Sequence, residues 1–76
     1  MPCVTPEGKP TASGMAMLRA LSEGLHSPEE IAETTNMSLF RVRSGLRELS
    51  FAGLTSPSSD GYELTEKGAE NLRDAS

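Results

Sequence analysis

The chain has no tryptophan, two phenylalanines, one tyrosine, one cysteine and one histidine. With so few aromatic rings, the core of a folded domain has to be built from Leu, Met, Val and Ile. The single cysteine, Cys3, cannot form an internal disulfide, which fits a reducing compartment. One cysteine and one histidine, His26, are too few ligands for a structural zinc site, so no metal and no cofactor are expected.

Long apolar stretches are also missing, and none approaches the ~20 residues that a membrane-spanning helix requires. The opening residues, MPCVTPEGKP, lack the basic and apolar segments of a secretory signal. We therefore expect a cytoplasmic protein without membrane attachment. Its 76 residues allow one small domain, and an apolar content of 36% is sufficient for a compact fold.

An excess of positive charge is absent as well. The formal net charge is −4, which counts against indiscriminate binding of nucleic acids. Residues 38–55 nevertheless contain Arg41, Arg43 and Arg47 against Glu48, a net charge of +2, so the remainder of the chain carries −6. The positive charge is concentrated on one segment.

Proline, glycine and capping residues divide the chain into an arm and one domain. Three prolines and a glycine in residues 1–10 predict a flexible arm or a strand-like extension. A single domain is expected over residues 11–74. Thr11 or Ser13 is the candidate N-cap of a first helix that runs to about Glu23.

The segment SPEEIAETTN predicts a short second helix. Ser27 is its expected N-cap, Pro28 its first residue and Glu30 the partner in a capping box. Two β-branched threonines before Asn36, which tolerates the left-handed conformation, predict the end of the helix. The acidic residues of this segment are Glu29, Glu30 and Glu33. We interpret them as residues that stabilise the start of the helix through its dipole and that face solvent.

A longer third helix is expected to begin at its N-cap Ser38 and to end at Ala52-Gly53. The helical spacing of its apolar residues predicts a buried stripe of Val42, Leu46 and Leu49.

Residues 54–64 predict a hairpin, with strands over 54–56 and 62–64 and a turn over 57–61. Thr65 is then the expected cap of a last helix.

This order of elements, with several short motifs, resembles the winged helix-turn-helix domain of MarR-like and ArsR-like transcriptional regulators of bacteria and archaea. Ala32 matches the small residue where two helices cross, Asn36 the turn residue and Met37 the apolar plug of the turn. The strings LRELSFAGLT and YELTEKG resemble the end of the family's third helix and its second wing strand. The resemblance covers roughly Thr11 to Leu72. It implies a mainly helical α+β fold, in which a three-helix core carries a two-stranded β-wing and a C-terminal helix.

The resemblance also implies that residues 38–52 form a recognition helix, which lies in the major groove of double-stranded DNA. With Val42 facing inward, a period of about 100° per residue points a stripe outward: Phe40, Arg43, Ser44, Arg47 and Phe51. Arginines suit guanine edges or phosphates, serines suit phosphates, and apolar side chains suit a thymine methyl. The candidate DNA contacts are Ser38, Leu39, Phe40, Arg41, Arg43, Ser44 and Arg47.

Several of these side chains have structural interpretations as well. Arginines on an exposed helix face are often only solvated. Phe40 can equally pack against the neighbouring helix, and Phe51 against the wing. Cys3, in a loose arm, is expected to be inert, and His26 to be a link residue rather than a pH switch.

The predicted wing offers little to DNA. Ser58 and Ser59 are its candidate contacts, whereas Asp60 repels phosphates and the tip has no Lys or Arg. The resemblance implies a DNA-binding transcriptional regulator. Because three arginines per chain are too few for tight binding by a monomer at physiological salt, we expect it to act as a homodimer. The alternative is a winged-helix module that binds a protein partner.

An enzyme is not expected. The sequence shows no nucleophile–base pairing, no metal-ligand spacing and no phosphate-binding glycine loop.

Overall fold

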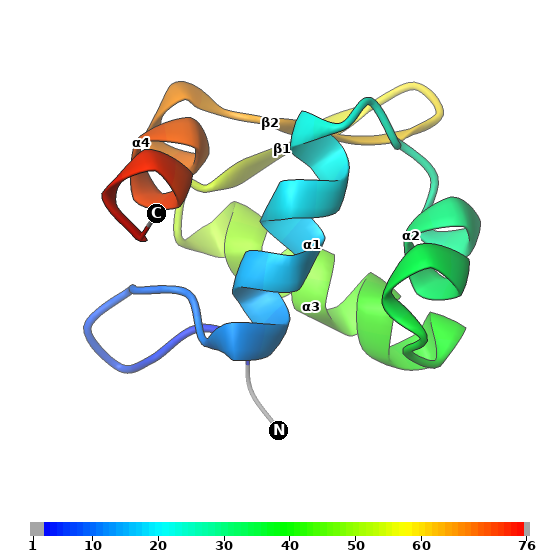
Figure 1. Cartoon of the computed structure of the whole chain (residues 1–76), viewed down its shortest axis with the longest axis horizontal. Helices are drawn as coiled ribbons and strands as arrows, with labels where there is room; N and C mark the ends of the chain where they lie inside the picture. The colour runs from blue at the N-terminus through cyan, green and yellow to red at the C-terminus, as the bar shows by residue number, and fades with distance from the viewer. Residues whose placement is uncertain (1–2, 76) are drawn as a thin grey trace.

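A computed structural model describes residues 3–75, which form four helices and one two-stranded antiparallel sheet. The elements are α1 (Ala12–Ser22), α2 (Pro28–Thr35), α3 (Leu39–Phe51), β1 (Thr55–Ser58), β2 (Gly61–Leu64) and α4 (Glu66–Ala75). Figure 1 shows α1 at the centre, α2 to its right, α4 to its left and the hairpin above. The expected fold class, a mainly helical α+β winged helix, is confirmed. None of the helices formed by residues 3–75 has the length and apolar character needed to span a membrane.

Side-chain caps begin each of the first three helices where the sequence predicts them. Ser27 Oγ accepts from the Glu30 backbone N–H at 3.2 Å, and Ser38 Oγ accepts from the Arg41 N–H at 3.2 Å. Thr11, rather than Ser13, caps α1. The reciprocal bond at Ser27 differs from a standard capping box, because the Ser27 hydroxyl donates to the Glu30 carboxylate at 3.2 Å.

The apolar faces of three helices meet in one core. Met17, Leu18 and Leu21 come from α1 and Ile31 from α2, and the predicted stripe of α3, Val42, Leu46 and Leu49, is fully buried. Asn36 adopts the predicted left-handed conformation, with φ of 59°, and so turns the chain from α2 into α3. These contacts fix α3 with one face in the core and the other toward solvent.

The hairpin is tighter than the sequence suggests. Ser58 pairs with Gly61, so the turn has two residues, Ser59 and Asp60, instead of the five predicted over 57–61. Leu54 is not part of β1, which begins at Thr55; its N–H donates to the Leu49 carbonyl at 2.8 Å and its side chain is buried. Pro57 is accommodated because a two-stranded sheet has only edge strands.

The link between α1 and α2 joins the hairpin. The Tyr62 N–H donates to the His26 carbonyl at 3.0 Å, while the His26 side chain is exposed. Gly61 makes this approach possible, since a Cβ there would overlap the His26 carbonyl. His26 is thus the link residue that the sequence predicts.

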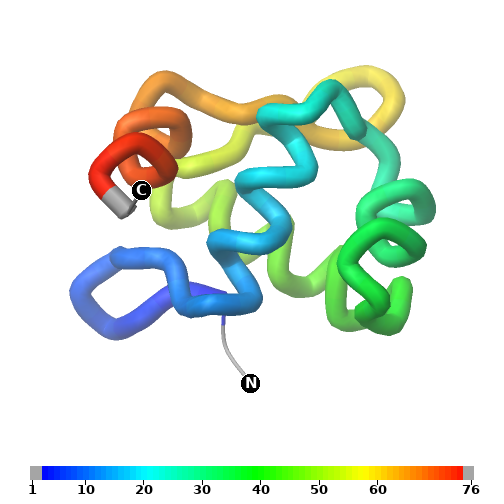
Figure 2. Tube along the Cα trace, viewed as in Figure 1, coloured from blue at the N-terminus to red at the C-terminus, as the bar shows by residue number. Residues whose placement is uncertain are grey.

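The N-terminal arm is folded in its described part, residues 3–10, whereas the sequence predicts a flexible or strand-like arm over 1–10. Val4 and Pro10 form an isolated antiparallel bridge, and Thr5 N–H donates to the Lys9 carbonyl at 2.7 Å. Figure 2 shows this loop returning to the start of α1. Cys3 is not loose, since its residue is only 1% exposed. Residues 1–2 lie outside the described residues.

Candidate nucleic-acid interface

The outward stripe predicted for α3 is exposed along its whole length. Phe40 and Phe51 are both 84% exposed, and Arg43, Ser44 and Arg47 between them are also exposed. The alternative in which Phe40 and Phe51 pack at the edge of the core is therefore wrong. The neighbouring helices bury only the opposite face of α3, so this stripe is free to meet another molecule.

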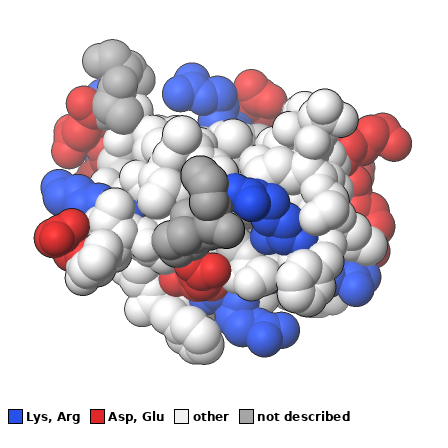
Figure 3. Space-filling model, turned by 90° about the horizontal axis from the view of Figure 1, so that it is seen from below, with Lys and Arg blue, Asp and Glu red and all other residues white. Residues whose placement is uncertain are grey.

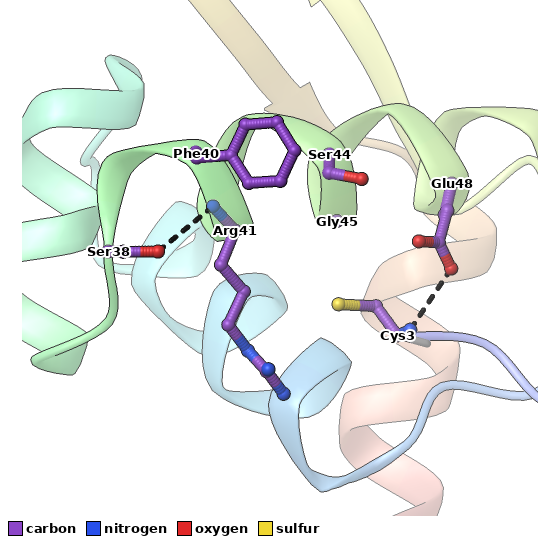
Figure 4. A pocket seen from close by; sticks show the side chains of 7 residues that line it. All are labelled: Cys3, Ser38, Phe40, Arg41, Ser44, Gly45 and Glu48. Carbon is purple, nitrogen blue, oxygen red and sulfur yellow. Dashed lines mark hydrogen bonds between the residues drawn. The ribbon is translucent and has the colours of Figure 1, made fainter. Parts of the chain in front are cut away.

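Arg41 differs from the other arginines of α3. Its Nη2 donates to Ser13 Oγ at 3.0 Å, and the residue is half-buried. In Figure 4 its side chain runs away from α3 toward the start of α1. Arg41 was predicted as a DNA contact, but the structure turns it into a link between two helices.

Arg43 is exposed but already has a partner. Its Nη2 lies 3.2 Å from Glu29 Oε2 on α2, with side chains that are 57% and 61% exposed. An ion pair this open to solvent contributes little to stability. It does place a carboxylate on the face where a phosphate would approach.

Arg47, the third arginine of α3, is neither turned toward another helix nor paired with a carboxylate. Among residues 3–75, no hydrogen bond or ion pair holds its guanidinium. Seen from below, the surface of the molecule has its basic side chains in separate groups, divided by uncharged surface and acidic side chains (Figure 3). Because Arg41 is turned toward α1 and Arg43 is paired with Glu29, the three arginines do not form the uninterrupted positive face that DNA binding predicts at its simplest.

A hollow of about 300 Å³ lies beside α3, where the arm passes under the helix. It brings together four of the predicted contacts with residues outside the prediction; its lining is Cys3, Ser38, Phe40, Arg41, Ser44, Gly45 and Glu48 (Figure 4). The Cys3 N–H donates to Glu48 Oε1 at 3.1 Å, which anchors the arm to α3. Gly45 supplies the space, since a Cβ there would lie 2.5 Å from Cys3 Sγ.

The thiol in this hollow is kept protonated by its surroundings. Burial, and secondarily the Glu48 carboxylate, raise the pKa of Cys3, while Arg41 opposes the shift. A protonated, buried thiol is a poor nucleophile, which agrees with the inert role expected for it.

The remaining predicted contacts are divided between surface and interior. Ser38 is exposed at the start of α3, whereas Leu39 is half-buried. At the wing, Ser59 is exposed, but Ser58 Oγ is enclosed and has no hydrogen-bond partner in the described structure. Ser59 and Asp60 thus form the wing tip, and the tip has no positive charge.

The sequence did not indicate which residues from other segments of the chain contact α3. Glu29 was assigned to helix-start chemistry, and its pairing with a residue 14 positions away leaves no local signal. The same holds for Cys3 and Glu48, which are 45 positions apart. No group of three or more His, Cys, Asp or Glu residues in the described part of the chain is placed to hold a metal ion.

Comparison with known proteins gives one family. A model described as "wHTH-PRTase associated", a winged helix-turn-helix (wHTH) family, matches residues 15–76. The match supports the winged helix-turn-helix part of the resemblance and does not extend to MarR-like or ArsR-like regulators. No curated protein and no solved structure matches the chain.

Proposed function

We propose, from the premise that the chain belongs to the wHTH-PRTase associated family, that it is a DNA-binding transcriptional regulator. In this role α3 is the recognition helix, it enters the major groove of double-stranded DNA, and two copies act together. The chain itself catalyses no reaction and works in the cytoplasm.

The observation that supports this proposal best is the exposed stripe of α3. Phe40, Arg43, Ser44 and Arg47 span two turns of a helix whose opposite face is locked into the core, and they begin at its N-terminal end. The N-terminal part of a recognition helix is the part that reaches base edges. Arg47, with no intramolecular partner among the described residues, is the side chain best placed to bind a guanine edge or a phosphate.

Two copies are needed because one copy has little positive charge to offer. Arg41 is turned toward α1, Arg43 is paired, and the wing tip has no cation. A two-fold pair doubles the number of arginines and presents two recognition helices about 34 Å apart, which matches one turn of the duplex. Analytical ultracentrifugation with and without DNA tests this part, and a protein that remains a monomer on DNA contradicts it.

Fluorescence anisotropy with a labelled random-sequence duplex at low salt tests DNA binding itself. We expect binding by the wild type and a loss of about tenfold or more in the double variant Arg43→Ala/Arg47→Ala, because each phosphate contact releases counterions and so strengthens binding at low salt. The double variant Arg19→Ala/Arg73→Ala removes two exposed arginines of α1 and α4, which lie outside α3, and serves as the matched control for folding and for net charge. An unchanged affinity in the arginine variant, or no binding by the wild type, rejects the proposal.

A second candidate function is a protein-interaction module, and the two exposed phenylalanines favour it. Large aromatic side chains together with arginines are typical of the centres of protein interfaces. The family description names a PRTase, so the partner to test is a PRTase from the same organism. Titration calorimetry with that enzyme should show binding that is weakened in Phe51→Ala, while DNA binding through Arg47 persists. Binding of the enzyme without any binding of DNA would favour this second function over the first.

A further inference from the structure

We propose that Glu29 of α2 acts as an electrostatic brake on DNA binding, because it neutralises Arg43 of the recognition helix. This inference rests on the DNA binding proposed above, and it identifies Glu29 as a residue that limits the affinity for DNA. Glu29 would make binding to DNA of arbitrary sequence weak, and would leave contact with base edges less affected.

The contact that supports this role is specific. Arg43 Nη2 and Glu29 Oε2 lie 3.2 Å apart, and theirs is the only ion pair among the described residues. The pair joins α2 to α3 on the outside of the molecule, where both side chains are more than half exposed. A phosphate that approached Arg43 would therefore meet the Glu29 carboxylate as well.

The geometry leaves Arg43 able to recognise a base. Glu29 contacts Nη2 alone, so other N–H donors of the guanidinium remain for a partner such as guanine O6 and N7. A guanine edge presents partial charges, whereas each phosphate has a full negative charge. Glu29 consequently penalises a phosphate contact more than a base contact, since two full charges repel each other more strongly than a full charge repels a partial one.

Glu33 provides a matched comparison within the same helix. It is exposed on α2, and its side chain makes no hydrogen bond or ion pair with another described residue. Glu33→Gln removes the same charge as Glu29→Gln without releasing an arginine. Glu30 does not serve this purpose, because its carboxylate accepts from the Ser27 hydroxyl at the start of α2.

The experiment measures affinity for a random-sequence duplex between about 50 and about 200 mM salt, where binding that depends on phosphate contacts changes most steeply. For Glu29→Gln we expect a gain of about three- to tenfold at low salt, and a slope of log K against log salt that is steeper by about one phosphate contact. Glu33→Gln should gain less than about twofold with an unchanged slope, because Glu33 forms no ion pair whose removal would release an arginine. Adding Arg43→Gln to Glu29→Gln should abolish the gain.

A second comparison leaves Glu29 in place and so does not depend on the folding of its variants. In the wild-type background, Arg43→Gln should cost less affinity for random DNA than Arg47→Gln, because Arg43 is already neutralised. Circular dichroism melts of every variant check that the fold is retained, and Glu29→Ala repeats the test if Glu29→Gln melts early.

The outcomes separate the brake from DNA binding itself. Equal gains in Glu29→Gln and Glu33→Gln, or an unchanged salt slope in Glu29→Gln, overturn the brake and leave the proposed DNA binding intact. A folded wild-type protein that binds no duplex at low salt overturns both.

Discussion

The inner and outer faces of α3 have opposite characters, although their residues alternate along the same 13-residue helix. Val42, Leu46 and Leu49 on the inner face are fully buried, whereas Phe40 and Phe51 on the outer face are 84% exposed. The chain has three aromatic residues, and it exposes two of them on this helix. The comparison indicates that the inner face holds the fold together and that the outer face is available for a partner.

The largest expected effect tests the inner face. Leu46→Ala removes a fully buried side chain, and we expect a loss of about 2–5 kcal/mol in the free energy of unfolding, because the cavity adds to the lost burial. Urea denaturation measures this loss. A loss below about 1 kcal/mol would show that the core around α3 collapses around the gap. In a domain this small, a loss at the upper end of the range unfolds much of the protein.

Gly45→Ala tests the side of α3 on which the arm lies. The new Cβ would lie 2.5 Å from Cys3 Sγ and 2.6 Å from Met17 Cε, so the arm or Met17 has to shift. We expect a net loss of about 1 kcal/mol, since overpacking costs about 1–3 kcal/mol while Ala favours the helix by about 1 kcal/mol over Gly. Faster reaction of Cys3 with a thiol reagent would report release of the arm. An unchanged reaction rate would mean that Met17 takes up the strain instead.

Single substitutions of the outer-face arginines compare a free cation with a paired one. Arg47→Ala should weaken DNA binding by about three- to tenfold at low salt, and Arg43→Ala by less, because Glu29 already neutralises Arg43. Neither change should alter the melting temperature by more than a few degrees, since both side chains are exposed. Equal losses in both variants would mean that the ion pair opens freely when DNA approaches.

The pH dependence of stability tests the boundary between the two faces, where Cys3 lies. Burial and Glu48 raise the pKa of the thiol in the folded protein, so folding favours the protonated form. This contribution is present below the pKa of the unfolded chain and is lost as pH rises through the higher folded pKa. The wild type should therefore lose more stability than Cys3→Ala in urea titrations as the pH rises above about 8.5, the ordinary pKa of a cysteine. Parallel pH profiles for the two proteins would contradict the raised pKa.

The smallest expected effect completes the comparison of the two faces. Phe51→Ser should change the free energy of unfolding by less than about 0.5 kcal/mol, because the side chain contributes little to the core. Its effect on binding separates the two candidate functions, since the interaction with a PRTase should weaken and DNA binding should not. A marked loss of stability would indicate that Phe51 packs against the wing after all.

Much of the fold follows from local signals in the sequence. The caps at Ser27 and Ser38, the left-handed Asn36 and the buried stripe of α3 each depend on residues within about one or two helical turns of one another. The hairpin shows a feature that such local signals do not determine. Its position was predicted, but its two-residue turn was not, because the pairing of Ser58 with Gly61 is decided by contacts across the strands.

The sequence by itself determined which face of α3 is buried and which is exposed, because helical periodicity depends only on the order of apolar and polar residues. The tertiary structure alone decided what each arginine on that helix does. Arg41 reaches Ser13, Arg43 reaches Glu29, and only Arg47 is left without a partner in the described part of the chain. Those partners lie 14 or more positions away, and packing of α1 and α2 against α3 brings them within hydrogen-bonding distance.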